Sequence, residues 1–397
     1  MKWICCQLGA REHCAIPRAL FRQGSLDHLL TDAWAPPGSS LAALPLGLGE
    51  RFHPDLTTAR VQAWNAELLA FELATRLKRL SGWPLIAARN QWFQQKVVSF
   101  LSSQLSTINY QPIFFSYSYS ALEPFRFAKS HSWSTVLGQI DPGPFEEEIV
   151  AAEAEREAPL APDWRRLPAD YWKSWREECD VADRIIVNSQ WSFDALVQLG
   201  IPREKLLIIP LALENKVPSI LPKVYPRRFT ESRPLRVLFL GQINLRKGIA
   251  RLLKAARSFQ SQPVEFVMVG PIQINISEDL RSNRKVRWVG PVARNKVRNY
   301  YEQADLFILP TLSDGFGLTQ LEALAHRVPV IASRQCGDVV IDRVNGLLLE
   351  EPTAAAIEEA LRSCLRNPDE LAQFSENTIV DERFSLSFLG TQLRTLA

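Results

Sequence analysis

Short apolar runs alternate with longer segments of helical periodicity along much of this chain. In the second half, the apolar runs are residues 236–240, 264–269, 286–289, 306–309 and 328–332. Segments with helical spacing of apolar side chains come between or after them, as at 295–303 and 353–366. Continuous apolar runs are typical of parallel strands that helices cover on both faces. The pattern therefore predicts a Rossmann-like α/β fold for this half of the chain.

The first half shows the same alternation, with longer irregular stretches between its elements. We expect strands at residues 3–6, 112–115, 135–139, 185–187 and 206–209. We expect helices at residues 16–22, 59–80, 90–105, 145–157 and 191–199. Residues 35–54 are rich in Pro, Gly and Ser, which indicates an irregular excursion.

The length of 397 residues exceeds what one hydrophobic core usually supports. Residues 216–234 contain four prolines and lack periodicity, so we interpret them as a linker between two domains. The predicted domains are residues 1–215 and 235–380, and residues 381–397 are expected to form a C-terminal helix.

The stretch from Leu306 to Ser333 carries the most specific chemistry. A predicted buried strand ends at Leu309, and a loop with two glycines leads into a helix. The glycines allow a tight turn, so the free N–H groups at the start of the helix can face an anion such as a phosphate. The N–H groups predicted to face this anion are those of Gly317, Leu318 and Thr319, and Gly315 and Phe316 of the same loop are also predicted to bind the ligand.

Two carboxylates bracket this loop. Glu322 is expected about one turn into the helix, where a carboxylate can accept hydrogen bonds from the paired hydroxyls of a ribose. Asp314 is expected at the mouth, nearer to whatever lies beyond the phosphates. Alternatively, Asp314 is only a capping residue and Glu322 only complements the helix dipole.

A second loop brings positive charge to the same edge of the predicted sheet. Gly241 follows the strand at 236–240, and Lys247 begins the next helix. Loss of a nucleotide diphosphate develops negative charge, which cationic side chains and helix N-termini can stabilise without a metal.

The two loops together resemble the donor site of family 4 glycosyltransferases of the GT-B fold, in particular their E-x7-E region. The resemblance covers the second domain almost continuously and the first in patches, including residues 182–210. It implies that Glu322 holds the ribose of a nucleotide sugar and Asp314 the hydroxyls of the transferred sugar. Asp314 stands where the family usually has Glu. The resemblance also implies two Rossmann-like domains facing a central cleft, with the last helix crossing back to the first domain.

The diphosphate clamp departs from the family pattern at one position. Gly241 and Lys247 match it, and Lys247 is implied to bind the diphosphate and act in catalysis together with Asp314. Gln242 stands where an Arg is usual, and Arg246 is the candidate to supply the missing charge. Loss of a charged contact in the transition state predicts weak or altered activity.

The first domain offers less specific candidates for the cleft. Gly9 stands where the family keeps a Gly-rich turn, and Arg11, Glu12 and His13 follow it in a strand-to-helix loop. These residues contact the acceptor or a phosphate, or they cap the first helix. Asp141 follows a strand and is a candidate cleft residue, with initiation of the Asp-Pro turn as the alternative.

The composition limits the classes of partner and cofactor that we expect. A net charge of +3 is too small to argue for nucleic acid, and the six scattered cysteines favour reduced thiols in a cytoplasmic protein. We find no metal-ligand spacing, so no metal or other cofactor is expected. The apolar run 3–6 is too short for a signal peptide, and no segment approaches the roughly 18 apolar residues of a membrane span.

The predicted helix at residues 90–105 has a basic and aromatic face that allows two interpretations. Basic and aromatic residues of segment 90–105 and its approach could touch a membrane or a lipid-linked acceptor, which would place the protein peripherally at the inner face of the membrane. These residues are Arg89, Trp92, Phe93, Lys96 and Phe100. Packing in the core with a solvated rim is the alternative.

The resemblance implies a retaining hexosyltransferase that moves a sugar from a nucleotide-diphosphate sugar to a saccharide or lipid-linked acceptor, as in polysaccharide, lipopolysaccharide or glycolipid synthesis. Two other functions stay open: a nucleotide-sugar epimerase, and a non-catalytic GT-B protein that binds a partner. A dehydrogenase is disfavoured because no G-x-G-x-x-G follows the first strand of either domain.

Overall fold

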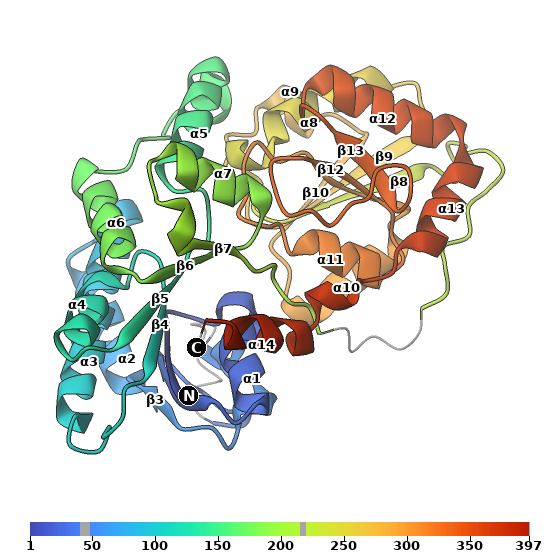
Figure 1. The fold of residues 1–397 in the computed structure, drawn as a ribbon. Coiled ribbons are helices and arrows are strands. Elements are labelled where there is room, and N and C mark those ends of the chain that lie inside the picture. Colours follow the sequence, from blue (N-terminus) through green and yellow to red (C-terminus); the bar gives the residue numbers. More distant parts are fainter. Residues whose placement is uncertain (40–47, 215–219, 397) are drawn as a thin grey trace.

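Two parallel β-sheets form the framework of the protein in the computed structural model, which describes residues 1–39, 48–214 and 220–396. The first sheet has seven strands in the order β3-β2-β1-β4-β5-β6-β7, and the second has six in the order β10-β9-β8-β11-β12-β13. Helices flank both sheets (Figure 1). The expectation of two Rossmann-like sheets is confirmed.

The first sheet takes up the first half of the chain. Its strands are β1 (Trp3–Gln7), β2 (Leu26–Thr31), β3 (Val61–Ala63), β4 (Ile113–Tyr117), β5 (Ser134–Gly138), β6 (Arg184–Val187) and β7 (Leu206–Ile208). The α-helices among them are α1 (Ala15–Arg22), α2 (Asn65–Leu77), α3 (Gly82–Gln104), α4 (Leu122–Ser130), α5 (Pro144–Arg156), α6 (Ala169–Val181) and α7 (Gln190–Gln198).

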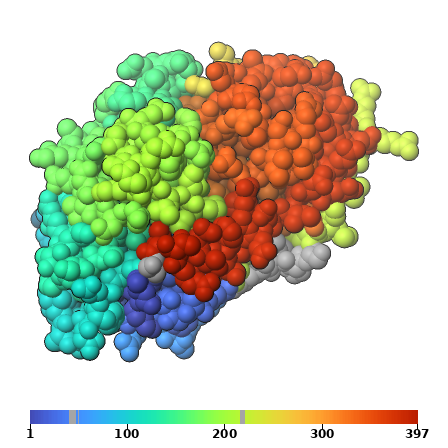
Figure 2. Space-filling model, in the orientation of Figure 1, coloured from blue at the N-terminus to red at the C-terminus, as the bar shows by residue number. Residues whose placement is uncertain are grey.

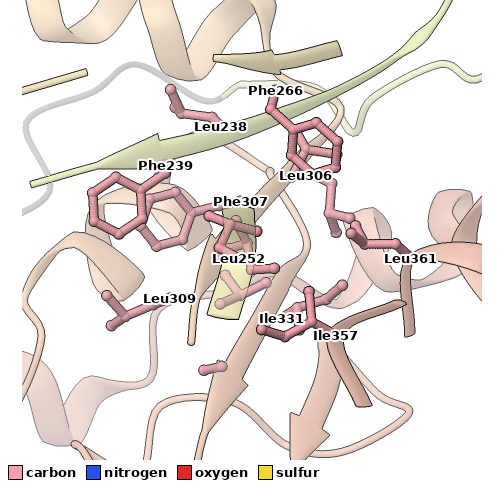
Figure 3. Close-up of a cluster of buried hydrophobic side chains, with 14 of the residues drawn as sticks. Leu238, Phe239, Leu252, Phe266, Leu306, Phe307, Leu309, Ile331, Ile357 and Leu361 are labelled. Atoms are coloured by element: carbon pink, nitrogen blue, oxygen red, sulfur yellow. The ribbon is translucent and has the colours of Figure 1, made fainter. Parts of the chain in front are cut away.

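The second sheet begins after the linker region. Its strands are β8 (Leu235–Leu240), β9 (Val264–Val269), β10 (Val286–Gly290), β11 (Leu306–Leu309), β12 (Val330–Ser333) and β13 (Gly346–Leu349). The helices are α8 (Ile249–Ala256), α9 (Glu278–Arg281), α10 (Arg294–Gln303), α11 (Thr319–Ala325), α12 (Ala354–Arg366), α13 (Pro368–Asn377) and α14 (Leu386–Arg394). Phe239, Phe307 and Ile331 are fully buried between sheet and helices (Figure 3).

The last helix returns to the first half of the chain. Leu386, Leu389 and Leu393 of α14 are buried in the same apolar cluster as Ala19 and Leu20 of α1. In Figure 2 this helix, in red, lies across the junction between the two halves of the molecule. The chain therefore passes between the two halves of the molecule twice, first at the linker region and again before α14.

Helix α5 ties the first half to the second. Ala154 belongs to the core cluster of the second sheet, and Arg251 Nη2 of α8 contacts Glu153 Oε2 at 2.9 Å. Farther along, the N–H of Asn275 donates to the carbonyl of Leu160 at 2.7 Å. An apolar contact, an ion pair and a backbone hydrogen bond thus hold α5 and its C-terminal extension against the second sheet.

Some predicted boundaries are wrong for identifiable reasons. The helix expected at 90–105 begins at Gly82, because Pro84 lies in its first turn, where a missing N–H loses no helical hydrogen bond. The helix expected at 59–80 begins only at Asn65, because Val61–Ala63 pairs in parallel with β2. Parts of the predicted irregular segment and linker, residues 40–47 and 215–219, lie outside the described residues.

Candidate active site

The two loops predicted to bind the donor meet at the carboxyl ends of adjacent strands. β8 pairs in parallel with β11, and the N–H of Leu312 donates to the carbonyl of Arg246 at 2.8 Å. Gly248 has a φ of +70°, and a Cβ there would lie 1.9 Å from the carbonyl oxygen of Pro310. Only glycine permits this close approach, which fixes Lys247 beside the β11–α11 loop.

Lys247 and Arg246 both act on the carboxylate of Asp314. Lys247 Nζ forms an ion pair with Asp314 Oδ2, and Arg246 Nη1 lies 3.6 Å from Oδ1. Burial alone would raise the pKa of Asp314, but the two cations outweigh it and hold the pKa at about 2. Asp314 is therefore a charged hydrogen-bond acceptor at neutral pH.

A second carboxylate, which the sequence analysis did not single out, reaches this cluster from the first domain. Glu146 lies in the first turn of α5, and its Oε1 is 3.5 Å from Nε of Arg246. Burial raises the pKa of Glu146 to about 8, and the charges of Asp141 and Asp314 add to this effect while Arg246 opposes it. The sequence gives no signal that separates Glu146 from Glu147 and Glu148 beside it.

Glu322 occupies the first turn of α11, as predicted. The hydroxyl of Tyr301 donates to its Oε2 at 2.8 Å, and burial raises its pKa while that hydrogen bond and Arg294 oppose the rise. Tyr301 is itself held by a stacked His326 ring, with centroids 5.0 Å apart. Tyr301 thus fixes the orientation of the Glu322 carboxylate through one of its two oxygens.

The rest of the β11–α11 loop is shaped by tight packing. Gly317 has a φ of +77°, and the buried Phe316 ring packs against Phe384. The N–H of Phe316 donates to Asp314 Oδ1 at 3.4 Å, so this amide serves the loop itself. For Gly317 and Leu318, contact with an anion stays a prediction.

The loop after β1 has an unusual backbone. Glu12, His13 and Cys14 are non-glycine residues with φ of 50°, 54° and 58°, a conformation that is often retained at functional sites. Burial, followed by the charges of Arg294, Arg18 and His53, lowers the pKa of His13 to about 4, so its ring is neutral.

The remaining residues of this loop have contacts that bear on the alternatives. Gly9 N–H donates to Asp32 Oδ1 at 3.0 Å, and the guanidinium of Arg11 lies 5.9 Å from the centroid of the Tyr117 ring. The alternative that this loop caps α1 is wrong, since the N-cap residue is Cys14 and no side chain among the described residues makes a capping hydrogen bond there. Arg294 acts electrostatically on both His13 and Glu322, so the two halves of the chain meet here.

Asp141 lies at a close contact between the two halves of the chain. A Cβ on Gly315 would be 2.0 Å from the carbonyl oxygen of Ile140, so the Asp141 loop packs directly on the Asp314 loop. Asp141 Oδ1 accepts hydrogen bonds from the Tyr119 hydroxyl and, at 2.9 Å, from the N–H of Gly143. It therefore organises its own turn, as the alternative predicted, and also faces the cluster around Arg246.

A cavity of about 1070 Å³ opens beside this cluster, between the two halves of the chain. Asp141 and Glu146 line it from the first half of the chain, and Arg246 and Gln242 line it from the second. Gln242 is exposed, and its Oε1 lies 3.5 Å from Nδ2 of Asn244. Gly241, just before it, donates its N–H to the carbonyl of Val269 at 3.0 Å.

The face proposed for a membrane packs instead within the first domain. Phe93 is fully buried, and the ring of Trp92 stacks on Phe71 of α2 at 5.3 Å. Lys96 Nζ lies 3.7 Å from Glu67 Oε1, and Arg89 pairs with Glu72. Helix α2 therefore covers this face, and the core-packing alternative is correct.

The part of the chain that the structure describes contains neither a membrane-spanning helix nor a cluster of metal ligands. None of its helices is both long and apolar enough to cross a membrane. No cluster of three or more His, Cys, Asp or Glu side chains among these residues is placed to hold a metal ion.

Comparison with known proteins identifies the second domain. Residues 226–380 match the family model described as "Glycosyl transferases group 1". D-inositol 3-phosphate glycosyltransferase 2 of Catenulispora acidiphila is 28% identical over 232 residues, which are 50% of this chain and 52% of that protein. Alpha-maltose-1-phosphate synthase of Mycolicibacterium smegmatis is 30% identical over 162 residues, 36% of this chain and 41% of that protein. The chain thus matches about half of these relatives' length or less.

Solved structures resemble the whole chain. HepE of Anabaena in complex with UDP gives a TM-score of 0.62 at 17% identity, covering 100% of this chain and 99% of that one. Sucrose-phosphate synthase of Thermosynechococcus elongatus gives 0.67 at 17% identity, with 100% and 98% covered. At such low identity these matches establish the fold, which is GT-B.

Proposed function

We propose that the chain is a retaining hexosyltransferase, on the premise that its residues 226–380 match the model of the group 1 glycosyltransferases. It transfers a sugar from a nucleotide-diphosphate sugar to an acceptor hydroxyl. The observation that carries the proposal is the meeting of Lys247, Arg246 and Asp314 at the carboxyl ends of β8 and β11. Lys247 and Arg246 supply positive charge for the diphosphate, and Asp314 beside them supplies a charged acceptor for the sugar hydroxyls.

The division of labour follows from the two domains. We propose that residues 235–380 bind the donor, that residues 1–215 bind the acceptor, and that residues 381–397 brace the first domain. UDP is the first donor nucleotide to test, because HepE of Anabaena was solved with UDP and with UDP-glucose. All six cysteines are buried and none forms a disulfide, which supports a cytoplasmic location.

In the proposed reaction the bond between the anomeric carbon and the diphosphate oxygen breaks, and a bond from the acceptor oxygen to that carbon forms on the same face. The proton of the acceptor hydroxyl passes to the departing diphosphate. Lys247 stabilises the charge that develops on the leaving oxygens, with Arg246 as the second cation. Asp314 fixes the sugar through its hydroxyls, since its low pKa keeps it an acceptor.

Glu322 holds the ribose in this proposal. The Tyr301 hydroxyl donates a hydrogen bond to Oε2 of Glu322. We assign the other carboxylate oxygen of Glu322, Oε1, to the ribose hydroxyls. Gln242 is neutral where the family usually has an Arg, so the clamp depends on Lys247 and Arg246. This substitution favours one alternative, a non-catalytic protein that binds nucleotide weakly.

The experiment is a thermal-shift screen with UDP, GDP, ADP, CMP and their sugars, without added metal. We expect one nucleotide class to raise the melting temperature of the wild type and not that of Glu322→Ala. Glu359→Ala is the matched control, since Glu359 is exposed on α12 and paired with Arg366. Lack of stabilisation by every nucleotide would instead support the non-catalytic alternative. Donor turnover without an acceptor, yielding an epimer, would support the epimerase.

A further inference from the structure

A second cavity, of about 590 Å³, adjoins the one beside the candidate active site and shares lining residues with it. It lies between α3, α4 and α6, which pack on one another in the first domain (Figure 1). Trp83, Tyr119 and Tyr171 line both cavities. We call the second cavity with these shared rings the α3–α6 groove. Each cavity is as large as a typical small-molecule site of about 300–1,000 Å³, so together they suit an extended ligand.

Aromatic rings form one wall of the α3–α6 groove. Tyr171 stacks on Tyr119 with centroids 5.1 Å apart, and Trp83 lies 6.0 Å from Tyr171. The Tyr119 hydroxyl is held by Asp141, at the candidate active site, whereas Trp83 is 38% exposed. The rings therefore lead from the reacting groups towards the outside, with orientations set by neighbouring rings. Flat rings of this kind pack well against the C–H faces of sugars.

Neutral amides form another part of the lining. Asn90, Gln91, Gln94 and Gln95 lie on one side of α3 and line the groove. Gln94 Oε1 accepts a hydrogen bond from the N–H of Glu123 at 3.0 Å, which leaves its NH₂ group to the groove. Within the described chain, the hydrogen bonds found do not use the side chains of Asn90, Gln91 or Gln95. Amides donate and accept, as sugar hydroxyls do.

The charges of the groove select against anions. Among the described residues that line it there is no Lys or Arg, while Glu123, Asp170 and Glu178 are present. The carboxylate of Glu178 is turned to backbone N–H groups, those of Tyr119 at 2.7 Å and Ala121 at 2.8 Å, and burial raises its pKa to about 7. A phosphate, an anionic lipid headgroup or a nucleic acid would lack a cationic partner here.

We propose that the acceptor is a neutral sugar chain of several units, whose terminal hydroxyl lies by Asp141, Glu146 and Arg246 and whose following sugars occupy the α3–α6 groove. This inference rests on the proposed function, because it takes the cluster around Arg246 as the reaction centre. It names the acceptor class, a saccharide chain bound along its length, and excludes recognition through a lipid.

Calorimetric titration of the full chain tests the inference. The probes are malto-, cello- and chito-oligosaccharides of one to six sugar units, and UDP in a separate titration. We expect the affinity of at least one series to rise with chain length. Gln91→Ala with Gln95→Ala should weaken the long oligosaccharide about tenfold, as expected for two hydrogen bonds. These exposed positions tolerate alanine in a helix, and Gln198→Ala on α7 is the matched control.

The outcomes separate the two proposals. Unchanged UDP affinity in the double variant with weakened oligosaccharide binding supports the inference. UDP binding with no response to any oligosaccharide, or with affinity independent of chain length, overturns it and leaves the proposed function intact. Binding to vesicles of phosphatidylcholine and phosphatidylglycerol in place of sugars also overturns it. Failure of every nucleotide to bind counts against the proposed function itself.

Discussion

Replacing Lys247 with Met removes the cation that lies closest to Asp314. The variant keeps the length and the apolar stem of the side chain, so the main change is the loss of its charge. Among the cationic side chains that the structure describes, Asp314 then retains only Arg246 as a partner, with Nη1 3.6 Å away. A buried carboxylate with a weakened partner destabilises the folded state.

The magnitude follows from the pKa of Asp314. It lies at about 2 in the folded protein against an ordinary value of 3.8, although burial alone would raise it. A difference of about two pH units corresponds to about 2.5 kcal/mol in favour of the charged form. Removing one partner of a buried pair costs about 3–5 kcal/mol, so we expect Lys247→Met to lose about that much stability at pH 7. Adding Asp314→Asn should restore part of it.

Urea unfolding followed by tryptophan fluorescence measures this loss. Because the folded pKa of Asp314 is below the unfolded value, its stabilisation is complete above about pH 4 and disappears as the pH falls towards 2. The gap between wild type and Lys247→Met should therefore be widest at neutral pH and narrow below about pH 4. Lys254→Met, at an exposed position of α8, is the control. A variant as stable as the wild type at pH 7, or a double variant no better than the single one, would refute the reasoning.

Three further predictions concern the same cleft. Because the pKa of Glu146 is raised to about 8, the free energy of unfolding of the wild type should fall as the pH rises from about 4.5 to 8. Urea unfolding of Glu146→Gln across this range should show a smaller fall. An equal fall in the two proteins would contradict this prediction. Gly315→Ala places a Cβ against the Ile140 carbonyl and should cost about 1–3 kcal/mol in urea unfolding. Gln242→Arg should tighten UDP binding about tenfold or more by calorimetry if the position meets the diphosphate, and an unchanged affinity would remove Gln242 from the site.

The strands of the second sheet could be predicted because helices cover both faces. β9, for example, is a continuous apolar run, and its predicted and observed bounds agree at Val264–Val269. β2 was not predicted, since its Leu26–Thr31 segment includes polar residues and is buried only in its second half. Pattern reading therefore works where burial is uniform along a strand and fails where a strand is buried at one end.

The candidate site divides in the same way. Lys247, Asp314 and Glu322 can be named as candidates from the sequence, because each lies in or just after a glycine-containing strand-to-helix loop that resembles the donor site of a known family. Glu146 was not, because its contact with Arg246 joins residues far apart in the sequence and depends on how the two domains meet. Contacts of this kind leave no periodicity along the chain, and only the folded structure reveals them.

Helix α5 shows why the domain contact matters to the chemistry. It carries Glu146 to Arg246 and Glu153 to Arg251, while Ala154 enters the core of the second domain. Arg246 is thus shared between a carboxylate of each domain, Asp314 and Glu146. A diphosphate beside Lys247 would compete with both for this guanidinium. Glu146, with a pKa of about 8, is mostly protonated at neutral pH and holds Arg246 only weakly, whereas Asp314 stays charged and paired with Lys247. The first domain would then tune how readily Arg246 serves the donor, which is the role left open by the neutral Gln242.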